Sequence, residues 1–337
     1  MRAAINDQYG DPSVLRVSDV PTPEIGAKEV LVQVFASDVT QGDRRLRAAD
    51  FPGLSAVFGR LMFGVWAPRN RVGGTSFAGR VVAVGAKVTR LEVGDDVFGS
   101  VMRGAYAEYL AVSADEPIAK MPANTSYIEA AALPYGGVTS LVFLRDLAKV
   151  QPGERVLVVG ASGGIGRIAV QMAKHLGAHV TAVASRNEDL VRSLGADAYI
   201  NYREDDFTKS GEHWDVIFDT TEGNHFRSFR AALSSAGRYL SLYMTVRVLF
   251  EMATTALRGG PRAITGVALG DADTLDEVCR LVEEGRIRAV VSERYPLEDI
   301  TAAHTSLEGA PSGSVVIEIT TVQPVLFNST SQLRQIA

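Results

Sequence analysis

A glycine-dense turn between a strand and a helix is the stretch of this sequence best suited to chemistry. The predicted strand 155–159 runs into GASGGIG (160–166), apolar residues then recur at helical spacing, and a second apolar run follows at 179–184. The start of a helix offers unpaired amides and the positive end of a dipole. The stretch therefore predicts a phosphate-binding site.

The positions of the glycines support a dinucleotide. Gly163 would let the backbone approach a diphosphate, and Gly166 would let helix and strand pack closely. Ala161 stands where the usual fingerprint has its first glycine. A tight turn without a ligand is the alternative. The complete strand–helix–strand order favours the dinucleotide site.

The second strand of this unit ends without an acid, in Ala184-Ser185-Arg186. Sites that prefer NAD carry Asp or Glu about twenty residues beyond the turn, where it binds the ribose diol. An acid would repel a 2′-phosphate, whereas serine and arginine would bind it. We therefore predict NADPH rather than NADH. The alternative is that Arg186 is a solvated residue at a helix start.

The elements that must position this turn fall into two classes. Residues 29–39 and 77–85 are rich in β-branched residues and introduce many short strands, which predict a partly open barrel or sandwich. Ser126 and Glu129 form a capping-box spacing where the pattern changes. Strands are then predicted at 155–159, 179–184, 199–201, 215–219 and 238–242. Because helices alternate with them, we expect a parallel sheet covered on both faces.

The C-terminal part is expected to complete the first domain. A helix follows Gly270, and a final strand is predicted at 313–319. We therefore assign residues 1–124 and 263–337 to one domain and 125–262 to the other. The tail 320–337 is polar and without period, which predicts loose packing.

Two apolar segments, 54–65 and 243–257, have helical periodicity. They predict a hydrophobic lid over a site for a bulky apolar substrate, amphipathic helices that cover the core, or a contact surface for a dimer or a membrane.

Composition excludes several classes of function. The chain has 337 residues, of which 46% are apolar, and a net charge of −5 that argues against nucleic-acid binding. The N-terminus has no apolar signal-peptide core, and no apolar stretch is long enough to span a bilayer. Cys279 is the only cysteine, so no internal disulfide can form and a cytoplasmic location is the default expectation.

With these residues in hand, the chain resembles the medium-chain dehydrogenase/reductase superfamily, and within it the zinc-independent, quinone-oxidoreductase-like branch. The resemblance extends to about residue 320 and is carried by MRAAINDQYGDPSVLRV, ASDVTQGD, GGTSFAGRVVAVG, AAALPYGGVTSL, GASGGIG and ADAYINYREDDF. It implies an α/β protein with a GroES-like β-rich domain and a doubly wound, parallel-sheet Rossmann domain. It further implies an active site in the cleft between them.

The resemblance also implies a reaction and a cofactor site. The reaction is hydride transfer from NADPH to a quinone or to the β-carbon of an activated alkene such as an enone. The residues that it places at the pyrophosphate are Ser162, Gly163, Gly164, Ile165 and Gly166. Around the 2′-phosphate it places Ser185, Arg186 and Tyr202, and elsewhere along the cofactor Thr139, Thr220, Leu242 and Tyr243. A homodimer is suggested by the resemblance alone.

Zinc-dependent members of the superfamily hold their metal with cysteine and histidine, because zinc prefers thiolate and imidazole ligands. Here the corresponding loop reads Ala36-Ser37-Asp38-Val39, and Thr75 stands at the histidine position. The five histidines are interpreted as surface or packed side chains. We therefore expect no metal, and without a Lewis acid alcohol oxidation is less well supported than reduction of an electrophile.

A developing enolate or hydroquinone anion needs donors aimed at it. The candidate catalytic residues are Thr40, Asp43 and Tyr135. The alternatives are a strand end for Thr40, a turn cap or a pair with a neighbouring arginine for Asp43, and packing for Tyr135. Solvent is the alternative source of the proton.

The sequence leaves the substrate open. A small apolar electrophile, a quinone or an enone, is the first expectation, with no nucleic acid and no integral membrane contact. A 2-enoyl-thioester reductase of lipid or polyketide metabolism is the second. A third reading is a non-catalytic NADPH-binding redox sensor, because a fold does not fix a function.

Overall fold

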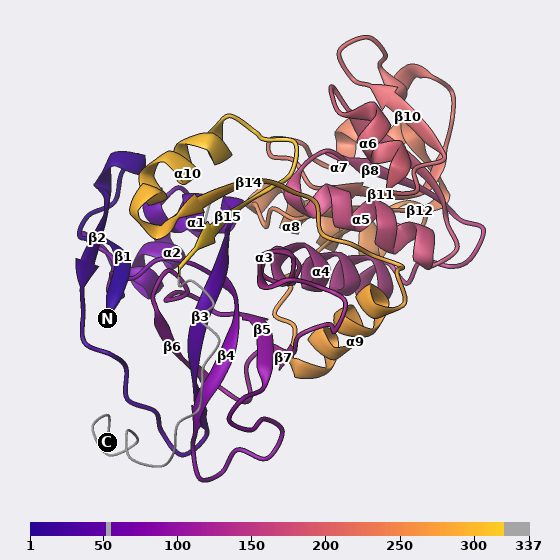
Figure 1. The fold of residues 1–337 in the computed structure, drawn as a ribbon. Helices are drawn as coiled ribbons and strands as arrows, with labels where there is room; N and C mark the ends of the chain where they lie inside the picture. The colour runs from indigo at the N-terminus through magenta and orange to yellow at the C-terminus, as the bar shows by residue number, and fades with distance from the viewer. Residues whose placement is uncertain (52–54, 320–337) are drawn as a thin grey trace.

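The computed structural model describes residues 1–51 and 55–319. Two large sheets stand beside each other, and the chain passes from the first to the second and back (Figure 1). The predicted tail 320–337 and part of the apolar segment 54–65 lie outside the described residues. No helix in the described part of the chain is long and apolar enough to cross a membrane.

The central sheet of the second half has six parallel strands in the order β10-β9-β8-β11-β12-β13. Their bounds are β8 Arg155–Val159, β9 His179–Ala184, β10 Ala198–Asn201, β11 Trp214–Asp219, β12 Leu233–Ser241 and β13 Arg262–Thr265. Numbered along the chain, the order is the doubly wound one, with its reversal between β8 and β11. The predicted Rossmann sheet is therefore confirmed, although β12 begins before residue 238 and β13 was not predicted.

Helix α5 (Gly164–His175) follows β8 directly and buries the apolar stripe that its sequence predicted. Beyond its C-cap Leu176, Gly177 takes the left-handed conformation at φ 83° that glycine tolerates. The remaining helices of this half are α6 Glu188–Ser193, α7 Phe226–Phe229 and α8 Val246–Arg258, with a 3-10 turn at Phe207–Lys209 and another at Arg230–Ala232.

The other large sheet is mostly antiparallel and has the order β14-β15-β3-β4-β5-β7, with β6 paired to β3. Its strands are β3 Glu29–Val39, β4 Ser76–Val84, β5 Asp96–Ser100, β6 Tyr109–Ser113, β7 Ile118–Lys120, β14 Val291–Pro296 and β15 Ser314–Glu318. A hairpin of β1 (Arg2–Asn6) and β2 (Leu15–Asp19) lies beside it. This sheet is the expected GroES-like domain.

The C-terminal part returns to the first sheet, because β14 and β15 reach β3 there (Figure 1). The division at residues 124/125 and 262/263 stays a prediction. Strand β13 belongs to the parallel sheet and crosses the second of these boundaries.

One hydrophobic core joins the two sheets. Helices α3 (Tyr127–Ala131) and α4 (Pro134–Leu141) stand at the junction, and the Ser126–Glu129 capping box at the start of α3 is confirmed. The core runs from Ala36 and Ala78 of the first sheet through Leu133 to Val156 of the second. Helix α9 (Ala272–Glu283) packs on α4 and completes it. A shared core holds the two domains in one arrangement.

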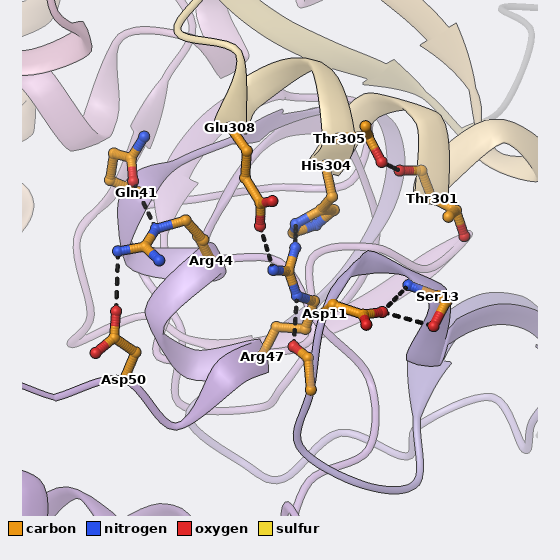
Figure 2. Close-up of polar contacts among 11 residues, drawn as sticks. Asp11, Ser13, Gln41, Arg44, Arg47, Asp50, Thr301, His304, Thr305 and Glu308 are labelled. Carbon is orange, nitrogen blue, oxygen red and sulfur yellow. Dashed lines mark hydrogen bonds and ion pairs between the residues drawn. The ribbon is translucent and has the colours of Figure 1, made fainter.

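A buried arginine ties helix α1 (Gln41–Ala48) to helix α10 (Ile300–Glu308), as Figure 2 shows. Arg47 is 3% exposed; its Nη1 lies 3.0 Å from His304 Nδ1, and its Nη2 donates to Glu308 Oε1 at 2.5 Å. A guanidinium has no acceptor, so Nδ1 must accept and the neutral imidazole carries its proton on Nε2. Burial, with a smaller contribution from Arg47, lowers the pKa of His304 to about 3.

This histidine predicts how stability depends on pH. An unfolded histidine has a pKa of about 6.5, so below that pH the unfolded chain binds a proton that folded His304 refuses. Stability above that pH is unaffected, and it falls with a slope of up to about 1.4 kcal/mol per pH unit as pH drops toward the folded pKa.

The measurement is urea unfolding from about pH 7 to about pH 5. His304→Asn keeps an acceptor for Arg47 without titrating, so its free energy of unfolding should fall less steeply with acid than that of the wild type. Equal slopes for the two proteins would show that His304 is not neutral in the fold.

Candidate functional site

A cavity of about 700 Å³ lies where the two sheets meet, at the carboxyl ends of the parallel strands. Its volume is that of a site for a sizeable ligand. The lining combines Gly160 after β8 and Thr220 after β11 with Thr40 and Arg45, which come from the other domain. It thus lies at the reversal of strand order, where open α/β sheets bind ligands.

The structure brings most of the sequence-predicted site residues to this cavity. Those that line it are Thr40, Tyr135, Thr139, Ser162, Gly163, Gly164, Ile165, Ser185, Arg186, Tyr202, Thr220, Leu242 and Tyr243. Two do not. Gly166 packs against the Gly160 carbonyl, and Asp43 is buried behind Thr40. The roles of all these residues remain predictions.

The start of α5 provides the phosphate end. Its N-cap is Gly163, which has no side chain to satisfy the first amides, whereas Thr40, Ser126 and Asp271 cap α1, α3 and α9. Nothing in the described residues lies within 4 Å of a Cβ added to Gly164. Free amides and open space in front of them are what a diphosphate requires, so this turn fits the expected cofactor.

Ser185, Arg186 and Tyr202 form a second polar end beside β9 and β10. Arg186 is exposed and makes no ion pair within residues 1–51 and 55–319. Hydrogen bonding by Ser185, followed by smaller effects of Arg203 and Arg186, lowers the pKa of Tyr202. The three side chains therefore form one cluster of donors, which suits a phosphate monoester.

Thr40 and Asp43 form a closed hydrogen-bonded pair at the start of α1. The Thr40 hydroxyl donates to Asp43 Oδ2 at 2.6 Å and accepts from the Asp43 amide at 3.1 Å, while the Thr75 hydroxyl also donates to Oδ2 at 3.2 Å. Burial raises the pKa of Asp43, and these hydrogen bonds partly offset that effect. The Thr40 proton is thus already committed to the carboxylate.

Tyr135 of α4 presents the other hydroxyl at the cavity. Burial raises the pKa of Tyr135, so the phenol stays protonated. None of the hydrogen bonds among the described residues uses its hydroxyl, and the Thr139 hydroxyl holds the Tyr135 carbonyl at 2.6 Å. Tyr135 therefore offers a donor without a hydrogen-bond partner in residues 1–51 and 55–319.

The sequence analysis missed three charged residues that line the cavity, namely Asp38, Arg45 and Arg167. Arg45 reaches from α1 to Glu222 of the other domain at 2.8 Å and lies over the Tyr243 ring at 4.8 Å from its centre. Its signal in the sequence is weak, because arginines are common on helices. Arg167 had a clearer signal: a cation among apolar residues at the start of a helix, where the dipole disfavours it.

Metal ligands and a lid have less support. No group of three or more His, Cys, Asp or Glu side chains in the described part of the chain could hold a metal ion. Residues 36–39, expected as a loop, are the end of strand β3, and Thr75 bonds to Asp43.

Met244 lines the cavity, but none of the described residues of α2 (Ser55–Phe63) or α8 does, so the cavity does not support the lid interpretation.

Two protein-family models match separate parts of the chain. The model described as "Alcohol dehydrogenase GroES-like domain" matches residues 26–123, and the one described as "Zinc-binding dehydrogenase" matches residues 194–317. The chain is 31% identical to "Quinone-oxidoreductase QR1, chloroplastic" of Triphysaria versicolor, covering 94% of this chain and 98% of the relative. It is 28% identical to "NADPH-dependent alkenal/one oxidoreductase, chloroplastic" of Arabidopsis thaliana, covering 94% and 79%.

Solved structures agree with these relatives. The quinone oxidoreductase of Escherichia coli complexed with NADPH superposes with a TM-score of 0.80 at 25% identity, covering 95% of this chain and 100% of that one. The CurK enoyl reductase superposes with a TM-score of 0.83 at 26% identity, covering 95% and 99%. The chain is therefore an oxidoreductase of the medium-chain dehydrogenase/reductase superfamily and belongs to its zinc-independent, quinone-oxidoreductase-like branch.

Proposed function

We propose that this protein is an NADPH-dependent reductase that delivers hydride, without a metal, to a quinone or to the β-carbon of an activated alkene. One observation carries the proposal. One cavity joins the N-terminus of α5, which has no side-chain cap, to an end where the Tyr135 hydroxyl makes no hydrogen bond within the described residues. The first end suits a dinucleotide and the second suits a small electrophile.

The preference for NADPH rests on charge. Ser185 and Arg186 directly follow β9, where a carboxylate would be needed to bind the ribose diol of NADH. Arginine holds a phosphate with several charge-assisted hydrogen bonds, and Tyr202 adds a hydroxyl. The Escherichia coli quinone oxidoreductase, which was solved in complex with NADPH, supports the same choice.

When bound, the cofactor supplies a hydride from its nicotinamide ring. The protein itself excludes water from the site, orients the substrate and donates a hydrogen bond to it. Val39, Phe143 and Met244 line the same cavity as Tyr135 and add apolar side chains to it. The Tyr135 hydroxyl donates a hydrogen bond to the substrate oxygen as negative charge develops on it. Thr40 and Asp43 are positioning residues: their side chains hydrogen-bond to each other and hold the start of α1 in place.

The apolar side chains of the cavity lining, Val39, Phe143 and Met244, favour a small uncharged electrophile as substrate. A 2-enoyl thioester is the second candidate, supported by the structural likeness to the CurK enoyl reductase. A cytoplasmic location and a homodimer remain predictions.

A panel of acceptors tests the proposal. Purified protein is given NADPH with a 1,4-quinone, a simple enone or crotonyl-CoA, and oxidation of NADPH is followed by absorbance. We expect kcat/KM for the quinone or the enone to exceed that for crotonyl-CoA by about tenfold or more, a difference of about 1.4 kcal/mol. Preference for crotonyl-CoA would establish the enoyl-thioester reductase. Cofactor binding without oxidation by any acceptor would indicate a sensor.

Arg186→Ala tests cofactor choice. Loss of the guanidinium should lower kcat/KM for NADPH by about tenfold or more and leave that for NADH within about twofold, because only NADPH carries the 2′-phosphate. Arg192→Ala is the matched control, since Arg192 lies on α6 and pairs with Glu188 at 2.8 Å. A wild-type protein that prefers NADH would contradict the assignment.

Tyr135→Phe tests the proposed donor. The variant keeps the ring and loses only the hydroxyl, so kcat should fall between about tenfold and a hundredfold while the Kd for NADPH stays unchanged. Tyr109→Phe serves as control, because Tyr109 lies in β6 and does not line the cavity. If Tyr135→Phe keeps full kcat, the Tyr135 hydroxyl does not stabilise the negative charge that develops on the substrate oxygen.

A further inference from the structure

Arg167 is a buried cation at the start of α5. It is the fourth residue of the helix, only 3% of its surface is exposed, and it lines the cavity. Side chains on a helix tilt toward its N-terminus. The guanidinium therefore lies back along the glycine turn, where its Nη1 donates to the Ser162 carbonyl at 2.8 Å.

This position is unfavourable for a cation on two counts. The first turn of a helix is the positive end of its dipole, which repels Arg167. Arg167 also has no ion pair within 4.0 Å among the described residues. A buried charge without a partner destabilises a fold. The burial lowers the pKa of the guanidinium, although an arginine remains charged.

The carboxyl group that acts on Arg167 does not remove the problem. Asp38 of β3 is 5% exposed and also lines the cavity, and it raises the pKa of Arg167 while burial lowers it. Burial raises the pKa of Asp38 well above its ordinary range, and the nearby Asp43 adds to the shift. Asp38 makes no ion pair with Arg167 within 4.0 Å in the described structure, and its Oδ1 has no hydrogen-bond partner there.

We propose that Arg167 is a cofactor-binding residue that supplies the counter-charge for the diphosphate at the start of α5. The inference rests on the proposed function, and it adds a binding residue that the glycine fingerprint does not contain. A diphosphate would bring negative charge to the place where the helix dipole, the amides of Gly164 and Ile165, and this guanidinium, which bonds to the neutral Ser162 carbonyl, lack a counter-charge within the described residues. One anion would relieve all of them.

The assignment gives Arg167 a different specificity from Arg186. NADPH and NADH share the diphosphate and differ only in the 2′-phosphate. Arg167 should therefore contribute equally to the binding of both dinucleotides, whereas Arg186 should contribute to NADPH alone. Equal losses for the two ligands are the signature of contact with the shared group.

Equilibrium binding of NADPH and NADH, measured by fluorescence and by the ligand-induced shift in Tm, tests this without any turnover. Arg167→Gln should raise both Kd values by about tenfold or more, the loss of a charge-assisted contact. Arg167→Lys should raise both by less, because it keeps the charge and loses the planar fork. Arg192→Gln is the control and should bind both dinucleotides as the wild type does.

The outcomes separate the two proposals. If the wild type binds neither dinucleotide, the proposed function fails and this inference fails with it. If the wild type binds both and Arg167→Gln binds both equally well, the inference alone is overturned. Selective loss of NADPH would overturn it too, because Arg167 would then act at the 2′-phosphate. Should Arg167→Gln fail to fold, as its Tm without ligand would reveal, Arg167→Lys decides by the same comparison.

Discussion

The cavity depends on how closely helix α5 begins against the end of strand β8. A Cβ on Gly166 would fall well inside the van der Waals radius of the Gly160 carbonyl, and one on Gly160 would lie 2.6 Å from the Thr220 hydroxyl. Gly160 also has φ 79°, which favours glycine. Because the chain turns without side chains, the first amides of α5 face the reversal of strand order. A bulkier turn would move them away from it.

Helix α1 makes the corresponding contribution from the other domain. The Thr40–Asp43 capping box hydrogen-bonds the backbone amides at its N-terminus. Arg47, near its C-terminus, pairs with Glu308 of α10. Arg45 reaches across the cavity to Glu222 and Tyr243. The helix is therefore fixed both to its own sheet and to the Rossmann domain. The positions of the Thr40 and Tyr135 hydroxyls are therefore fixed by packing that does not depend on a ligand.

Much of this architecture could be predicted because it depends on patterns within short stretches of the sequence. Glycine spacing, a 3.6-residue stripe and alternating strands are features of short windows, and they located β8, α5, β9 and the glycine turn that lines part of the cavity. Strand β13, a four-residue strand at the edge of its sheet, was not predicted. Strand β12 begins with Leu233-Ser234-Ser235, whose polar residues hid its start. Asp43 was expected at the cavity, but the capping box turns its carboxylate away from the lining.

The contacts that depend on distant parts of the chain could not be predicted in this way. Nothing in a local window brings Asp38 of β3 near Arg167 of α5, since their meeting requires both domains to be packed. What the sequence does contain is a conflict, a cation placed where the helix dipole opposes it. Arg186 is exposed and makes no ion pair among the described residues, so its assignment rests on pattern and position alone. Arg167 is buried against two opposing effects, and a fold keeps such a group only where something offsets them. For that reason the buried, unfavourably placed Arg167 is a stronger indication of an anion-binding site than the exposed Arg186.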